Sequence, residues 1–72
     1  SQALPKPKQV PPSQEVLKTF KQIKKNHPKL EQQYAMKLSE TIVKKANKHG
    51  VSSRVLAAML MQESGYKISA KN

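Results

Sequence analysis

Apolar residues recur at helical spacing in three stretches of the chain, separated by polar and turn-forming residues. In the first stretch the apolar positions share one side of a helix and lysines fill most of the others. These apolar positions are Val16, Leu17, Phe20 and Ile23. Ser13 is a suitable N-cap, and Asn26 with His27 interrupts the pattern. The pattern predicts a helix over about residues 14–25 that packs against the next helix, with a position on a membrane surface as the alternative.

The second stretch repeats an apolar residue every four positions after Pro28. Its apolar positions are Leu30, Tyr34, Leu38, Ile42 and Ala46, with Ala35 and Val43 beside them. Pro28 suits the first turn of a helix, where a missing N–H costs nothing. Gly50 suits the left-handed position just after a helix. The pattern predicts a helix over about residues 28–48.

The third stretch, VLAAMLM over residues 55–61, is apolar on nearly every side of a helix. Ser52 is the expected N-cap and Gly65 the expected end, which predicts a helix over about residues 53–64. A helix of this kind belongs in the middle of a core, and two amphipathic helices supply too little cover. We therefore expect further polypeptide or a partner protein to complete the core.

The predicted fold class is all-α, with three helices after an extended arm. Residues 1–12 hold four of the five prolines, which predicts a polyproline-II-like arm, and residues 13–72 form the helical segment. The arm is either a docking peptide or a tether, and its composition favours a tether. The chain has neither an initiating Met nor a secretory signal, so we expect it to have been processed or excised from a longer protein.

The net charge of +10 favours polyanions such as nucleic acid, anionic lipid or anionic envelope polymers. Arg54 is the only arginine and aromatic residues are few, so sequence-specific nucleic-acid recognition is not expected. Non-specific binding of DNA or anionic membrane through the lysines stays an alternative. No apolar run is long enough to span a bilayer. Cysteine is absent, and His27 and His49 lack metal-ligand spacing, so no metal or cofactor is expected.

Glu63 follows the most apolar stretch, at the predicted end of the third helix. Helical spacing puts Glu63 on the face of Leu56, Met59 and Leu60. The negative end of the helix dipole and partial burial would both favour the protonated carboxyl, the form that can protonate a glycosidic oxygen. The alternative interpretation is a solvated surface residue.

Residues 30–72 resemble the opening of the catalytic domain of lytic transglycosylases of the soluble, goose-lysozyme-like type. Family members read I-x-x-x-A, K-x-G-V, an apolar L-x-x-A helix, E-S-G-F/Y, and an Ala four residues on. The matching residues here are Ile42, Ala46, Lys48, Gly50, Val51, Leu56, Ala57, Leu60, Glu63, Ser64, Gly65, Tyr66 and Ala70. The chain departs from the family at Lys67 and Ile68, where Asn-Pro is usual, and it ends at Asn72 before the family's Gly-Leu-Met-Gln segment.

The resemblance implies the N-terminal part of a lysozyme-like domain that cleaves peptidoglycan. Glu63 would be the single catalytic acid and base, Ser64 would help to position Glu63 or the substrate, and Tyr66 would pack beneath the site. The implied reaction cuts glycan strands between N-acetylmuramic acid and N-acetylglucosamine and leaves a 1,6-anhydro product. The implied location is the bacterial periplasm or cell envelope, or a phage virion acting on that envelope. We expect this chain alone to hold an incomplete site, and a non-catalytic docking module of a larger envelope or virion assembly is the alternative.

Overall fold

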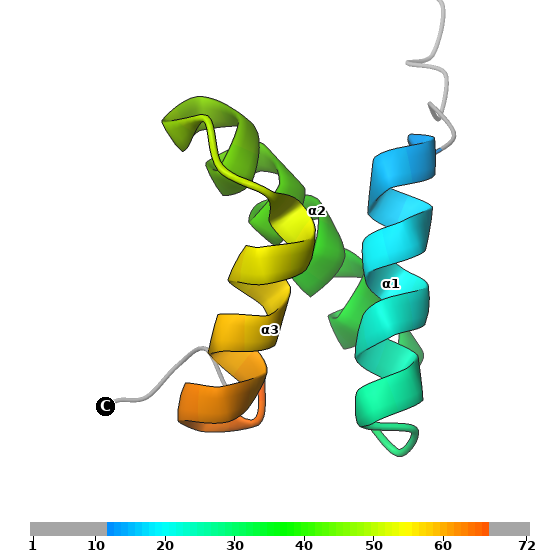
Figure 1. The fold of residues 1–72 in the computed structure, drawn as a ribbon. Coiled ribbons are helices and arrows are strands. Elements are labelled where there is room, and N and C mark those ends of the chain that lie inside the picture. Colours follow the sequence, from blue (N-terminus) through cyan, green and yellow to red (C-terminus); the bar gives the residue numbers. More distant parts are fainter. Residues whose placement is uncertain (1–11, 67–72) are drawn as a thin grey trace, which may run out of the picture.

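Three helices make up the regular structure in the computed structural model, which describes residues 12–66. They are α1 (Gln14–Asn26), α2 (Gln32–His49) and α3 (Ser53–Ser64) (Figure 1). No strand occurs among the described residues, so the predicted all-α class is confirmed. Most of the arm predicted over residues 1–12 lies outside the described residues, as do Lys67, Ile68 and Ala70.

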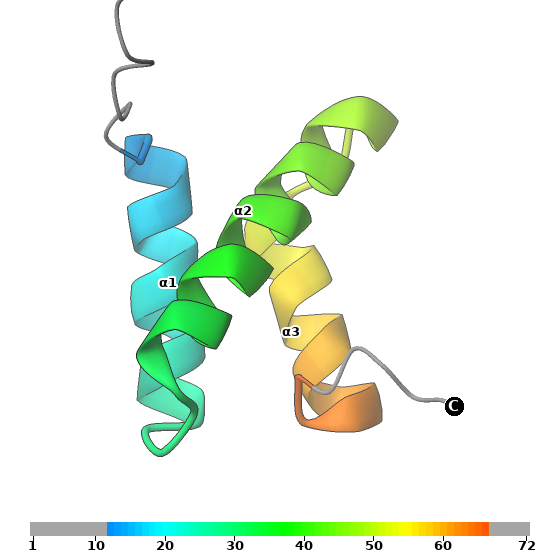
Figure 2. The ribbon, with the colours of Figure 1, turned by 180° about the vertical axis from the view of Figure 1, so that it is seen from behind.

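The helices form a small three-helix unit in which each helix packs against the other two. Helices α1 and α3 run in the same general direction, and α2 runs back across them (Figure 1). Seen from the other side, α2 lies in front of both (Figure 2). The α1/α3 pair therefore has one face covered by α2 and an opposite face that no other described element covers.

The core lies where the three helices meet. Its buried members are Ile23, Ala35, Leu38, Ile42, Ala57 and Tyr66. The small side chains of Ala35 and Ala57 let the helix backbones approach closely at the centre. Three polar side chains are also buried, and each has a hydrogen-bond partner. Thr19 donates to the Glu15 carbonyl and Ser39 to the Ala35 carbonyl, within their own helices, and Ser53 donates to the Glu15 carboxylate on α1.

The caps predicted from the sequence are present at four helix ends. The Ser13 hydroxyl accepts a hydrogen bond from the Val16 N–H at 3.1 Å, and Ser52 does the same for Val55 at 3.2 Å. Gly50 and Gly65 end α2 and α3 in the left-handed conformation, with φ of 66° and 61°. These local signals place the boundaries of α1 and α3 to within one residue of the prediction.

The predicted start of the second helix at Pro28 is wrong, because α2 begins at Gln32. Pro28 and Leu30 lie in the connection, where the Lys24 ammonium donates to the carbonyls of both residues at 2.8 and 2.6 Å. The Glu31 carboxylate then caps α2 by accepting from the N–H groups of Gln33 and Tyr34. The carbonyls of the connection are thus satisfied by a side chain of α1, and the helix starts where Glu31 can satisfy the N–H groups.

The Glu31 cap makes part of the stability depend on pH. The N–H groups of Tyr34 and then Gln33 hold the pKa of the Glu31 carboxyl below its ordinary value of 4.5. Because the folded pKa is lower than the unfolded one, this stabilisation is fully present above pH 4.5 and is lost as the pH falls through the folded pKa. We expect Glu31→Gln to melt at a lower temperature than the wild type at neutral pH, with the difference narrowing below pH 4.5. Thermal melts followed by circular dichroism across this range would check it, and a difference that stays constant would contradict it.

Helix α3 is less covered than its sequence predicts. We expected it in the middle of a core, yet Ser53 and Ala57 are its only buried residues. Val55 and Met59 are 56% and 49% exposed. Within residues 12–66, α3 therefore has a covered side toward α1 and α2 and an apolar side that faces outward. No described helix has the length and apolar character needed to cross a membrane.

Candidate functional site

The C-terminal end of α3 holds all three residues that the sequence marks as candidate site residues. After Ser64, the chain turns through Gly65, whose N–H donates to the Met61 carbonyl at 3.0 Å. Tyr66 follows with φ of 71°, so two consecutive residues have left-handed backbone. For a bulky side chain this conformation costs about 1–2 kcal/mol, which the surrounding structure has to offset.

Tyr66 holds this turn against the other two helices. Its side chain is fully buried in the core. The Asn26 side-chain amide at the end of α1 donates to the Tyr66 hydroxyl at 3.2 Å. The Tyr34 hydroxyl, at the start of α2, donates to the Tyr66 carbonyl at 2.7 Å. The end of α1, the start of α2 and the end of α3 are thus tied together at one corner of the molecule.

Glu63 lies one turn after Met59 on the outward side of α3 and is exposed. Within residues 12–66 its carboxylate has neither a hydrogen-bond partner nor an ion-pair partner. The partial burial that we expected against Leu56 and Leu60 is absent, because both of these side chains turn partly into the core. The described residues therefore fix the backbone of Glu63 in the last turn of α3 and leave its carboxylate in solvent.

The Ser64 hydroxyl donates to the Leu60 carbonyl at 3.0 Å. This bond is local to α3, so Ser64 contributes to the order of the last turn. Of the other glutamates, Glu31 caps α2, Glu15 accepts from the Ser53 hydroxyl at 3.0 Å, and Glu40 is exposed on α2. None of these three lies in the last turn of α3, so Glu63 is the only one of the four glutamates on that turn.

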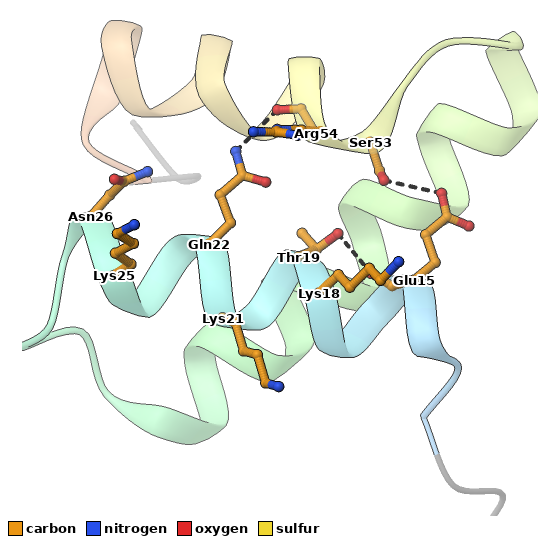
Figure 3. Close-up of a pocket in the computed structure, with 9 residues that line it drawn as sticks. All are labelled: Glu15, Lys18, Thr19, Lys21, Gln22, Lys25, Asn26, Ser53 and Arg54. Carbon is orange, nitrogen blue, oxygen red and sulfur yellow. Dashed lines mark hydrogen bonds between the residues drawn. The ribbon is translucent and has the colours of Figure 1, made fainter.

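A second feature is a groove of about 540 Å³ between α1 and α3, on the face that α2 leaves uncovered (Figure 3). It is lined by Glu15, Lys18, Thr19, Lys21, Gln22, Lys25, Asn26, Ser53 and Arg54. The sequence analysis did not identify this groove. The spacing of Lys18, Lys21 and Lys25 does place them on one side of α1, but a groove that Arg54 also lines requires α1 and α3 to lie side by side.

No group of three histidine, cysteine or acidic side chains that could hold a metal ion exists among residues 12–66. Both histidines lie at helix ends: His27 is the C-cap of α1, and His49 is the last residue of α2. The last turn of α3 thus offers one carboxylate, that of Glu63, whereas four of the nine residues that line the groove are basic.

No protein-family model matches the chain, and no curated protein or solved structure is significantly similar to it.

Proposed function

We propose that the chain carries the catalytic acid of a peptidoglycan lytic transglycosylase, with Glu63 as general acid and base. One observation supports this most: Glu63 is an exposed carboxylate without a partner among residues 12–66, held at the end of α3 by a turn that Tyr66 locks into the core. A catalytic acid needs both a fixed position and freedom to contact the substrate. The E-S-G-Y sequence and the ordered resemblance around it supply the reaction class.

In the proposed reaction, the Glu63 carboxylic acid donates its proton to the oxygen that joins N-acetylmuramic acid to N-acetylglucosamine, and the bond from C1 to that oxygen breaks. The resulting carboxylate accepts the proton of the muramic acid 6-hydroxyl while the oxygen of that hydroxyl bonds to C1. The product is a 1,6-anhydro ring, and no water is consumed. A single carboxylate suffices for this route, whereas the usual glycosidase plan needs two.

Ser64 and Tyr66 act as positioning residues in this proposal. The Ser64 hydroxyl orders the last turn of α3 through the Leu60 carbonyl, and Tyr66 fixes the turn that follows. In this proposal the bound glycan covers the exposed Glu63 side chain and excludes water from it. The net charge of +10 suits an anionic cell envelope, whether the protein belongs to that envelope or to a phage virion acting on it.

Digestion of purified peptidoglycan tests the proposal. The 72-residue chain and any longer protein that contains it would be incubated with glycan strands, and the soluble products would be analysed by mass spectrometry. We expect muropeptides that end in 1,6-anhydro-N-acetylmuramic acid, which are lighter by one water than the products of hydrolysis. Products with reducing ends would indicate a hydrolase, and the absence of products from both proteins would contradict enzymatic cleavage.

A second candidate function is a non-catalytic docking module of a larger envelope or virion assembly. The observation that favours it is the outward apolar side of α3, where Val55 and Met59 are 56% and 49% exposed. Contiguous exposed apolar patches are a feature of protein–protein contact surfaces. Partner binding without any glycan cleavage would favour this function over catalysis.

A further inference from the structure

The groove between α1 and α3 is strongly cationic. Four of its lining residues are basic, namely Lys18, Lys21, Lys25 and Arg54, and one is acidic, namely Glu15. The Lys21 side chain points away from α3 (Figure 3). The Glu15 carboxylate already accepts a hydrogen bond from Ser53, at one end of the groove (Figure 3). The excess of positive charge favours an anionic occupant.

Two side-chain bonds hold the walls of the groove together. The Gln22 side-chain amide on α1 donates to the Arg54 carbonyl on α3 at 3.0 Å, and the Ser53 hydroxyl on α3 donates to Glu15 on α1 (Figure 3). These contacts cross from one helix to the other over almost two turns of α1. The spacing of the walls is therefore fixed before any occupant binds, which lowers the entropy cost of binding.

An apolar surface continues directly from the cationic groove. Gln22 and Arg54 also line a second, shallower hollow, whose other lining residues are Val55, Ala58, Met59 and Gln62. Val55 and Met59 lie one helical turn apart and are about half exposed. Arg54 thus marks the line where a basic surface on α1 meets an apolar surface on α3.

The cationic surface and the apolar surface together indicate which class of macromolecule binds here. A nucleic acid or an anionic glycan would neutralise the lysines but would leave Val55 and Met59 in water. Among residues 12–66, no aromatic side chain on which a base could stack lines either hollow. A protein segment with carboxylates on one side and apolar side chains on the other would satisfy both surfaces.

We infer that the face formed by α1 and α3 binds an acidic amphipathic segment of a partner protein. Its carboxylates lie against Lys18, Lys25 and Arg54, and its apolar side chains cover Val55 and Met59. This inference goes beyond glycan cleavage and does not rest on it, since it involves neither Glu63 nor a sugar. It gives the docking-module candidate a defined surface and a partner of defined chemistry.

The test uses a synthetic probe, a fluorescein-labelled helix of about 15 residues with leucines every three or four positions and glutamates elsewhere. A scrambled peptide of the same composition has the same charge without the apolar stripe. Fluorescence anisotropy with the 72-residue chain at about 0.15 M salt would give both affinities. We expect the amphipathic peptide to bind at least about tenfold more tightly than the scrambled one, which is about 1.4 kcal/mol.

Variants distinguish binding at the proposed surface from attraction by the overall charge of the chain. We expect Lys18→Glu with Lys25→Glu to weaken amphipathic-peptide binding by about tenfold or more, and Val55→Ser with Met59→Ser to abolish its advantage over the scrambled peptide. Lys44→Glu with Lys45→Glu is the matched control, because these exposed lysines on α2 carry the same charge outside the groove. Circular dichroism would verify that each variant is folded.

Three results would overturn the inference. The first is equal binding of the scrambled peptide, and the second is equal loss of binding in the α2 control. The third is tighter binding of a single-stranded DNA of equal charge than of the amphipathic peptide, which would identify a polyanion surface. Peptide binding and anhydro-muropeptide release are separate measurements, so failure of one leaves the result of the other intact.

Discussion

Tyr66→Ala is expected to remove most of the chain's free energy of unfolding. The Tyr66 ring is fully buried among residues from all three helices, and removing a buried aromatic ring costs about 3–5 kcal/mol. A domain of this size has a total stability near the low end of about 5–15 kcal/mol. The substitution also leaves a left-handed residue without the packing that offsets its backbone strain.

Urea unfolding followed by circular dichroism at 222 nm would measure the loss. Tyr66→Phe is the matched control, because it keeps the ring and loses only the hydroxyl that accepts from Asn26. Asn26 is exposed and can turn to water instead, so we expect Tyr66→Phe to cost no more than about 1 kcal/mol. An alanine variant within about 1 kcal/mol of the wild type would show that Tyr66 does not hold the corner together.

Glu63→Gln is expected to abolish release of anhydro-muropeptides while leaving the fold unchanged. The glutamine side chain has the same shape but can neither donate the proton to the glycosidic oxygen nor accept one from the 6-hydroxyl. General acid catalysis and general base catalysis each increase a rate by a factor of about 10²–10⁴, and Glu63→Gln removes both. Because Glu63 is exposed and has no partner among the described residues, the free energy of unfolding should change by less than about 0.5 kcal/mol.

The rate would be measured by mass spectrometry of products, in whichever protein releases them, the 72-residue chain or a longer one that contains it. Glu40→Gln is the control, since it removes the same charge from another exposed glutamate, on α2. Retained product formation in Glu63→Gln would contradict the assigned role. Loss of product in both variants would show that activity depends on net charge and not on the corner held by Tyr66.

Helix ends were predictable where the signal is local. Ser13, Ser52, Gly50 and Gly65 each act on a backbone group within five residues, so a short stretch of sequence contains the whole interaction. The start of α2 was not predictable in this way. Glutamate is not a common N-cap. The connection before it is held by the Lys24 ammonium, which donates to the carbonyls of Pro28 and Leu30, and these contacts depend on the path of the chain after α1.

In the candidate site, too, the features set by local sequence were predictable and those set by distant residues were not. The placement of Glu63 at the end of α3 follows from the apolar stretch and Gly65, and the structure contains that helix end. The partners of Tyr66 are 40 and 32 residues away, at Asn26 and Tyr34, and no periodicity in the sequence joins them. The exposure of Val55 and Met59 was also missed, since a pattern that is apolar on every side does not tell which side the neighbouring helices cover.

The anchoring of Tyr66 also sets an order for folding during synthesis. Helices α1 and α2 are joined by a short connection, so they can pair as soon as both have left the ribosome. The residue that closes the core between them comes after α3, and it contacts residues made 40 and 32 positions earlier. Until Tyr66 emerges, Ile23 and Leu38 lack one of the side chains that bury them, and the nascent chain presents an open apolar surface to chaperones.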